Sequence, residues 1–193
     1  MEEKNYFRRI NEKERIIIFN SIQKISQEFL SIFNDFENNL FISLNEPIRK
    51  NKFPKIYLIL DNLKEIINKV NFRDKIYSAG LFFGYIKKGK FQVSLEGLEF
   101  LYKQGKSSKF HHLYVNEKGE KSVLYGNDII KSMIIKKFSH FNKNDLLIIL
   151  NDGHEILAIT QALINFESIE KLNLESKIAY NLVDKGYYLR EMQ

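Results

Sequence analysis

SVLYGNDIIKS, residues 122–132, is the stretch that decides how the C-terminal half of this 193-residue chain is predicted to fold. Residues 122–125 include strand formers, Gly126 can adopt the backbone of a tight turn, and either of the two polar residues after it can cap a helix. The pattern predicts a strand, a turn and a helix from about Asp128 to Lys137. The free amides at the start of such a helix attract phosphate, so this corner is a candidate anion site. The alternative is the same corner without a ligand.

On either side of this corner, short apolar runs separated by turn residues predict β-strands. The triplet Asn151-Asp152-Gly153 is a strong turn signal between two of these runs, and residues 117–120 are predicted to form another turn. The predicted strands are residues 111–115, 146–150, 156–164, 178–183 and 187–189. Short strands around one helix predict a small β-barrel.

The N-terminal half alternates between helical and strand periodicity. Apolar residues recur at spacings of four and three over about residues 11–33, which predicts a helix there. Strands are predicted at residues 40–44 and 55–60, a helix from Asp61, and a hairpin with strands 81–86 and 91–95 around a glycine-containing turn. This half is therefore predicted to be an α/β domain with an antiparallel sheet flanked by helices, which makes the whole chain α+β.

The stretch from Gln104 to Lys109 is polar and rich in small residues, the composition of a linker. A chain of this length can bury two small cores. The sequence is therefore divided into two predicted domains, residues 1–105 and 106–193.

The composition is that of a folded soluble protein, with 44% hydrophobic and 28% charged residues. No apolar run approaches the roughly 18 residues needed to cross a bilayer, and the chain starts with acidic residues rather than a signal-peptide pattern. The sequence has no cysteine, which excludes disulfides, thiolate metal sites, iron–sulfur clusters and a cysteine nucleophile. We expect a cytoplasmic protein, nucleolar if the source is eukaryotic, with no cofactor, no metal and no membrane partner.

Further blocks of sequence share their order and residue types with one known family. These blocks are Gly80–Tyr85, Phe91–Ser94 leading to Leu98–Leu101, and Asp184–Arg190. With residues 122–132 they resemble the Nip-seven family of large-subunit ribosome biogenesis factors, whose last domain is a PUA domain, a small RNA-binding β-barrel. The resemblance covers residues 75–193 well, whereas the segment before it agrees with the family in element order more than in identity.

The resemblance implies a non-catalytic RNA-binding factor that acts in pre-rRNA processing and large-subunit assembly. Its N-terminal domain would offer surface to ribosome-assembly or exosome-type proteins. Its C-terminal PUA-like domain would bind RNA, such as pre-rRNA or uridine-rich single strands, and the chain would be a monomer. Carried over position by position, the RNA-binding residues are Tyr125, Gly126, Asn127, Lys131, Lys185 and Arg190. Lys136, Lys137, Lys171 and Lys177 are added for charge alone, and for each lysine a merely solvated position is the alternative.

The formal net charge of +6 favours an anionic partner, because cations that neutralise phosphates release condensed counterions. Residues 1–105 carry 18 basic and 13 acidic residues, against 12 and 11 in the rest, so the excess is mostly N-terminal. There, basic residues crowd two loops, at Arg49, Lys50, Lys52 and Lys55 and at Lys87, Lys88 and Lys90. We hypothesise that one loop extends the RNA footprint or meets an acidic partner; the alternative is solubility and protection of a hairpin edge.

The sequence carries no recognisable catalytic motif. The four histidines, His111, His112, His140 and His154, lack metal-ligand spacing, and there is no P-loop, dinucleotide-binding glycine motif or nucleophile elbow. We therefore expect no enzyme. Two alternatives remain open: an RNA-modification enzyme or enzyme subunit that carries a PUA domain, for pseudouridylation, methylation or base exchange, and a protein adaptor without RNA binding.

Overall fold

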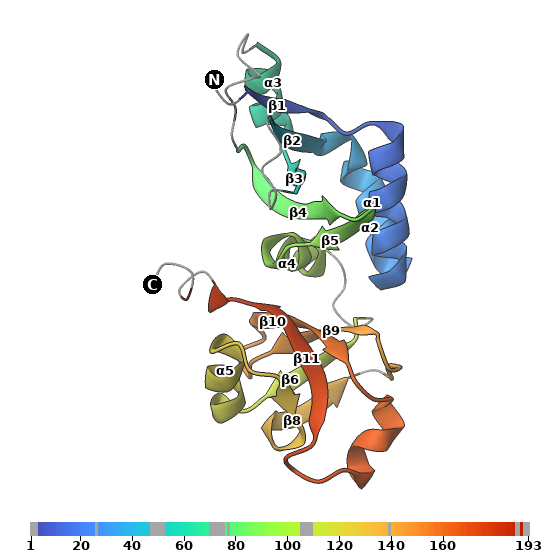
Figure 1. Ribbon diagram of the computed structural model, residues 1–193, viewed down its shortest axis with the longest axis vertical. Helices are drawn as coiled ribbons and strands as arrows, with labels where there is room; N and C mark the ends of the chain where they lie inside the picture. Colours follow the sequence, from blue (N-terminus) through green and yellow to red (C-terminus); the bar gives the residue numbers. More distant parts are fainter. Residues whose placement is uncertain are drawn as a thin grey trace. The chain divides into compact units, whose positions relative to one another are not determined.

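A computed structural model of the chain describes residues 4–25, 27–46, 53–69, 76, 78–104, 110–138, 140–187 and 190. The chain forms two compact units, Met1–Lys106 and Ser107–Gln193. Each unit has its own sheet and its own hydrophobic core (Figure 1). We call them the N-terminal unit and the C-terminal unit.

Five antiparallel strands form the sheet of the N-terminal unit, in the order β1-β2-β3-β4-β5. The strands are β1 (Lys4–Arg9), β2 (Leu40–Glu46), β3 (Lys55–Leu58), β4 (Leu81–Lys87) and β5 (Lys90–Val93). The helices are α1 (Glu12–Ile25), α2 (Gln27–Phe36), the 3-10 helix η1 (Glu37–Asn39), α3 (Asp61–Lys69) and α4 (Leu95–Gln104). The spatial order of the strands follows the chain, so the sheet is a meander into which helices are inserted.

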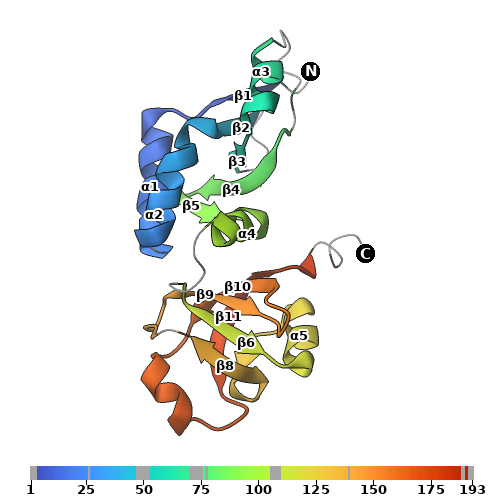
Figure 2. The same ribbon diagram turned by 180° about the vertical axis from the view of Figure 1, so that it is seen from behind.

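Apolar side chains alternate between the two faces of this sheet, because successive strand residues point to opposite sides. On one face Phe83 packs edge-on against Phe36 of α2, with ring centroids 5.4 Å apart. On the other face a cluster around Phe7 and Tyr57 packs against Ile67 of α3. Figures 1 and 2 show α1 and α2 side by side. Each face therefore has helical cover, but from different helices.

Most of the N-terminal elements agree with the sequence prediction, with three exceptions. The predicted helix over residues 11–33 is two helices, α1 and α2, and neither β1 nor α4 has a counterpart in the prediction. The hairpin between β4 and β5 is confirmed, and its turn residues Lys88 and Gly89 have φ of 49° and 71°. Two positive φ values mark the tight hairpin turn whose twist matches that of the strands. The basic residues of the segment 47–52 lie outside the described part of the structure.

The C-terminal unit is a six-stranded sheet in the order β7-β11-β10-β9-β6-β8. Its strands are β6 (His112–Val115), β7 (Ile129–Ile130), β8 (Ile134–Phe138), β9 (Leu146–Leu150), β10 (Ile156–Ala162) and β11 (Lys177–Asp184), with α5 (Glu117–Leu124) and the 3-10 helices η4 (Lys131–Met133) and η5 (Phe166–Lys171). The pair β6–β9 is parallel, and the other pairs are antiparallel. Register shifts in several pairs bend the strands around one core, so the barrel-like architecture predicted from the sequence is confirmed.

The central stretch of the sequence prediction is wrong in this unit. Residues 122–124 belong to α5 rather than to a strand, and the predicted helix from Asp128 to Lys137 is instead β7, the short turn η4, and β8. The β-branched residues of this stretch pair with partner strands: Ile129 lies opposite Ala179, and Ile134 lies opposite Val115. Tyr187, predicted to begin a strand, has a helical backbone.

Within the described ranges, no helix is long and apolar enough to cross a membrane. Over the same residues, no three His, Cys, Asp or Glu side chains come together as metal ligands. Two of the histidines make close internal contacts: His154 Nδ1 lies 2.6 Å from the Tyr114 hydroxyl, and His112 Nδ1 lies 2.6 Å from the carbonyl oxygen of Phe110. These contacts give both rings a structural role.

Candidate nucleic-acid interface

Local signals explain why residues 117–124 are helical. The Asn116 side chain accepts a hydrogen bond from the Gly119 N–H at 2.8 Å and so caps the start of α5. One turn along the helix, the Lys121 ammonium donates to Glu117 at 2.8 Å. This ion pair raises the pKa of Lys121 and lowers the pKa of Glu117. The segment predicted as a turn is therefore a capped first helical turn.

The helix α5 ends in a Schellman motif centred on Gly126. The N–H of Gly126 donates to the Val123 carbonyl at 2.8 Å, and the N–H of Asn127 donates to the Ser122 carbonyl at 3.2 Å. Gly126 has a φ of 86°, in the left-handed region that glycine occupies without a steric penalty. The sequence interpretation placed this glycine before a helix, whereas it stands directly after one.

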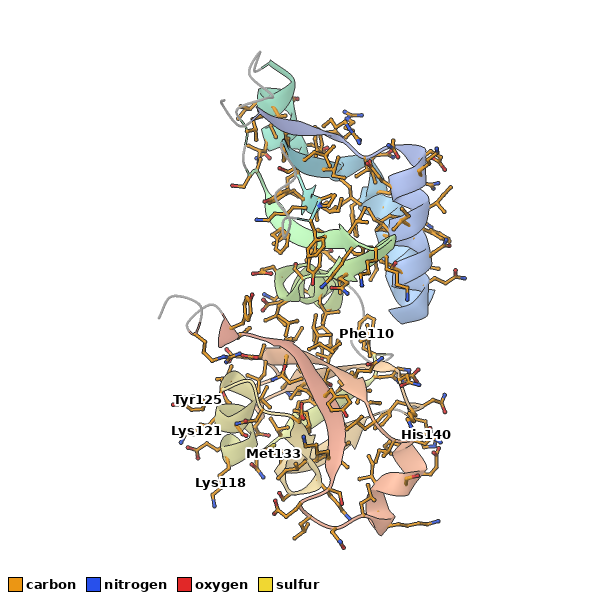
Figure 3. The ribbon with its side chains drawn as sticks, in the orientation of Figure 1. Phe110, Lys118, Lys121, Tyr125, Met133 and His140 are labelled. Atoms are coloured by element: carbon orange, nitrogen blue, oxygen red, sulfur yellow. The ribbon has the colours of Figure 1, made fainter. Side chains whose placement is uncertain are left out.

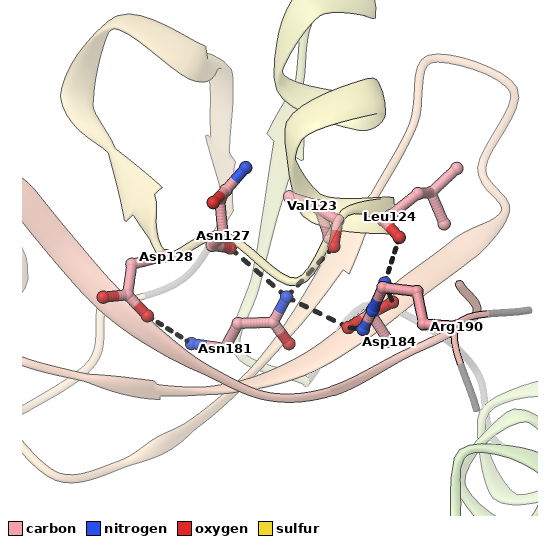
Figure 4. A network of polar contacts seen from close by, with 7 residues as sticks. All are labelled: Val123, Leu124, Asn127, Asp128, Asn181, Asp184 and Arg190. Atoms are coloured by element: carbon pink, nitrogen blue, oxygen red, sulfur yellow. Dashed lines mark hydrogen bonds and ion pairs between the residues drawn. The ribbon is translucent and has the colours of Figure 1, made fainter. Parts of the chain in front are cut away.

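This reversal changes the electrostatics of the corner between α5 and β7. A helix start presents free N–H groups, but a helix end presents free carbonyl oxygens and the negative end of the helix dipole. The predicted phosphate site on free helix amides is therefore wrong. Side-chain donors cover the carbonyls instead: the Arg190 guanidinium donates to Leu124, and the Asn181 amide donates to Val123 at 3.1 Å (Figure 4).

Arg190 joins the helix end to the end of β11. Its Nη1 and Nη2 donate to the two carboxylate oxygens of Asp184 at 3.0 and 2.8 Å. The Asp184 side chain is only 4% exposed, and its hydrogen bond raises the pKa of Arg190. The arginine that the sequence analysis assigned to RNA is therefore held by the protein itself, as Figure 4 shows.

Asn181 is the second residue whose side chain donates hydrogen bonds across this corner. Its Nδ2 lies 3.2 Å from the Asn127 carbonyl and 3.4 Å from Asp184 Oδ2, and its backbone N–H donates to Asp128 at 3.1 Å. Polar contacts from one side chain thus reach the helix end, the loop after it and β11. The corner is rigidly built, and sequence reasoning missed this residue because no motif points to it.

Two glycines make room for the Arg190 guanidinium. A Cβ atom at Gly186 would lie 1.9 Å from the Leu124 carbonyl oxygen and 2.8 Å from Arg190 Nη1. A Cβ atom at Gly126 would lie 3.0 Å from Arg190 Nη2. Any side chain at Gly186 would collide with backbone, so this glycine is required for close approach rather than for RNA contact.

Asp128, the other acidic residue of the corner, is also paired. Its carboxylate accepts a hydrogen bond from the Lys177 ammonium at 2.8 Å, which raises the pKa of Lys177, with a smaller contribution from Tyr180. The Lys177 side chain remains 60% exposed. Because Asp128 and Asp184 each face a cation, the corner is not a net negative surface.

The remaining predicted lysines fall in different places. Lys131 donates to the carbonyls of Glu170 and Leu172 at 2.9 and 2.7 Å, so it ties η4 to the end of η5. Lys171, at the end of η5, is exposed. Lys185 follows Asp184 and is partly buried. The side chains of Lys136 and Lys137 lie outside the described part of the structure, although both residues belong to β8.

Two family models match the chain and divide it as the fold does. The pre-PUA domain of NIP7/UPF0113 matches residues 7–95, and the UPF0113 PUA domain matches residues 111–193. The chain belongs to the NIP7/UPF0113 family. Its C-terminal unit is the PUA unit of that family, and the resemblance drawn from the sequence is confirmed.

Relatives within the family come from archaea and from animals. The chain is 26% identical over 172 residues to a UPF0113 protein of Archaeoglobus fulgidus, covering 88% of this chain and 91% of the relative. It is 26% identical over 137 residues to the 60S ribosome subunit biogenesis protein NIP7 homolog of Danio rerio, covering 70% and 73%. The homolog from Xenopus tropicalis is 23% identical over the same length.

Solved structures support the two-domain fold. A conserved PUA domain protein from Thermoplasma acidophilum superposes with a TM-score of 0.59 at 14% identity, covering 97% of this chain and 98% of that one. A hypothetical protein from Pyrococcus horikoshii gives a TM-score of 0.62 at 14% identity, covering 95% and 98%. At this identity the likeness concerns the fold alone.

Exposed aromatic residues stand beside the polar network of the PUA unit. Tyr125, at the end of α5, is 76% exposed, and Figure 3 shows it on the outside of the unit, near Lys121 and Lys118 of the same helix. On β11, Tyr180 is 48% exposed and neighbours Lys177. Sequence reasoning missed Tyr180, and strand alternation gives no signal for it, because the consecutive residues Ile178 and Ala179 are both buried.

Proposed function

We propose that this chain is a non-catalytic RNA-binding factor of ribosome biogenesis, acting in pre-rRNA processing and large-subunit assembly. The names of its vertebrate relatives and its membership of a PUA family support the proposal. The RNA would lie on the surface around the α5–β7 corner, formed by Tyr125, Gly126, Asn127, Lys177, Tyr180 and Lys185. We call this set the corner surface.

One observation carries the proposal: Tyr125 leaves 76% of its side chain exposed at the end of a rigidly held helix. A large aromatic ring in water, on a backbone fixed by a Schellman motif, is ready to stack on a base without ordering a loop first. The side chain of Tyr180 is also exposed. Two tyrosines suit single-stranded RNA, whose unstacked bases expose their faces.

Lysine side chains, rather than the amides of a helix start, would bind the phosphates of the RNA. Lys177 keeps most of its side chain in solvent although it pairs with Asp128, and Lys185 directly follows the buried Asp184. Arg190 acts indirectly in this proposal, since its guanidinium holds the helix end and β11 together through hydrogen bonds to Leu124 and Asp184. It positions the surface and does not bind the phosphate.

The N-terminal unit would supply the contacts to ribosome-assembly or exosome-type proteins. Leu60 and Ile66, just before and within α3, are 63% and 58% exposed. Exposed apolar side chains of this segment are candidates for contact with another protein. A factor of this kind would work in the cytoplasm, or in the nucleolus of a eukaryotic cell.

Binding of fluorescent oligouridine and of a structured pre-rRNA fragment tests the corner surface. Tyr125→Ala should weaken binding by about fivefold or more, because base–aromatic stacking contributes roughly 1–3 kcal/mol per base. Tyr125→Phe keeps the ring and should bind nearly as the unchanged protein does. Equal affinity of the alanine and phenylalanine variants would remove Tyr125 from the interface, and failure of the unchanged chain to bind either RNA would refute the function.

A further inference from the structure

Aromatic rings and lysines come together on one face of the N-terminal sheet, next to the area that α3 covers. The rings of Phe53 and Tyr85 stack with centroids 5.8 Å apart and an interplanar angle of 24°. The Lys87 ammonium lies 4.9 Å from the centroid of the Phe53 ring. Phe53, which precedes β3, is 39% exposed. An aromatic pair is thus held at the surface with a cation directly on it.

The strand register explains why these residues meet. Lys55 of β3 lies opposite Tyr85 of β4, so the two side chains share a face of the sheet. Lys87 is two residues after Tyr85 and therefore points to the same side. The Lys55 ammonium lies 6.0 Å from the ring of Phe82, which also belongs to this face. Strand residues make up this group except for Phe53, which precedes β3.

Four lysines lie on or beside this face. Among the described residues, Lys55, Lys87, Lys88 and Lys90 form no ion pair with a carboxylate. Lys90 lies opposite Lys87 in the hairpin, so like charges are placed side by side. Such a pair opposes folding slightly unless an anion binds between the two. The hairpin thus concentrates positive charge beside the exposed ring.

We propose that Phe53, Lys55, Tyr85, Lys87 and Lys90 form a second contact surface for single-stranded RNA, which we call the sheet platform. One base stacks on Phe53, whose ring is backed by Tyr85. The lysines bind the phosphates on either side of that base. The proposal goes beyond the corner surface of the PUA unit, and it rests on the proposed function in taking RNA as the ligand.

The combination of ring and cations favours RNA over an acidic protein segment. Lysines alone would satisfy carboxylates, but an exposed ring stacked on a second ring offers a flat face that suits a base. The Lys87 ammonium, now at that ring, can move to a phosphate on its flexible stem as the base arrives. Stacking of a base is stronger than an exposed cation–π contact, so the exchange is favourable.

Binding of fluorescent oligouridine to the full chain over a salt series tests this proposal. The double variant Lys55→Gln/Lys87→Gln should bind roughly tenfold more weakly. Its log–log salt slope should fall by about 1.4, since each phosphate contact on a single strand contributes about 0.7. The matched control is Lys13→Gln/Lys103→Gln, which removes two exposed charges from α1 and α4 of the same unit. The control should keep the slope of the unchanged protein.

A further variant, Phe53→Leu, tests the ring separately from the charge and keeps an apolar side chain at the surface. It should weaken binding with an unchanged salt slope. If the unchanged chain binds RNA and Tyr125→Ala weakens it, but both platform variants bind normally, the sheet platform is refuted and the proposed function stands. Equal losses of RNA affinity in Lys55→Gln/Lys87→Gln and in its control Lys13→Gln/Lys103→Gln also refute the sheet platform. If the unchanged chain binds no RNA, both proposals fail.

Discussion

The guanidinium of Arg190 and the carboxylate of Asp184 form a bidentate ion pair, with nitrogen–oxygen distances of 3.0 and 2.8 Å. The carboxylate is almost completely buried, and the same guanidinium donates to the carbonyl of Leu124 at the end of α5. One side chain therefore satisfies a buried charge and a free helix carbonyl together. A basic residue that the sequence suggested as an RNA contact can thus have a structural role.

Replacing Arg190 by glutamine should destabilise the C-terminal unit, because it leaves the buried carboxylate of Asp184 without its cation. The melting temperature should fall by several degrees at neutral pH. Thermal unfolding followed by circular dichroism at neutral pH measures the effect.

The control for this experiment is Lys121→Gln, which removes one charge from an exposed pair of the same unit. Exposed ion pairs contribute little, so the control should melt close to the unchanged protein. If the melting temperature falls equally in Arg190→Gln and Lys121→Gln, the Arg190–Asp184 pair stabilises the unit no more than an exposed ion pair does.

The glycines around Arg190 should respond differently to alanine. Gly186→Ala places a Cβ against the Leu124 carbonyl and should destabilise the unit by about 1–3 kcal/mol. Gly126→Ala forces alanine into a positive φ beside Arg190, which costs about 1–2 kcal/mol. Urea unfolding of each variant gives these free energies.

Gly153 provides the control for the glycine series. Its φ is not in the left-handed region, and an added Cβ would approach no backbone atom and only the side chain of Asn151, at 3.3 Å from Oδ1. Gly153→Ala should therefore stay within roughly 0.5 kcal/mol of the unchanged protein. A Gly186→Ala variant as stable as Gly153→Ala would contradict the packing described for the corner.

The sequence predicted the strands of both units better than it predicted the corner. Strand runs and the Lys88-Gly89 turn carry local signals that tertiary structure does not override. Residues 117–120 were interpreted as a turn because of Gly119, but that glycine is helical and packs closely: a Cβ there would lie 2.8 Å from the Cβ of Met133. The need for a small residue comes from a segment that follows α5 in the chain, so no local pattern reveals it.

The candidate site was predictable in part. The residues at the corner were found from the glycine motif and the family resemblance, but their electrostatics were inverted because Gly126 was placed before a helix instead of after one. Asn116 and the Glu117–Lys121 pair were usable signals for the start of α5, and Gly126 was a usable signal for its end. The internal partners of Arg190 and Lys131 could not be predicted, since they depend on contacts distant in sequence.

Lys131 should contribute to stability more than to RNA binding. Its ammonium donates to the Glu170 and Leu172 carbonyls, so Lys131→Met removes two hydrogen bonds and should destabilise the unit by about 1 kcal/mol. The salt slope for oligouridine should stay unchanged. A slope reduced by about 0.7 in this variant, with unchanged stability, would instead indicate a direct phosphate contact.

The raised pKa of Tyr57 predicts that the protein loses stability at alkaline pH. Burial raises the pKa of its phenol above the ordinary value of 10.0. A raised pKa in the folded state means that stability is complete below about pH 10 and falls as the pH rises through the folded-state value. Tyr57→Phe should flatten this fall in urea unfolding between pH 9 and pH 11, and an unaltered fall would exclude Tyr57 as its cause.

The central claim is that the corner surface of the PUA unit binds RNA. Amide chemical shifts of the full chain, recorded by nuclear magnetic resonance during titration with oligouridine, test it most directly. The account predicts that the shifts of residues 125–128 and of β11 change together and saturate with one affinity. Saturable binding that leaves the amides of residues 125–128 unmoved would contradict it.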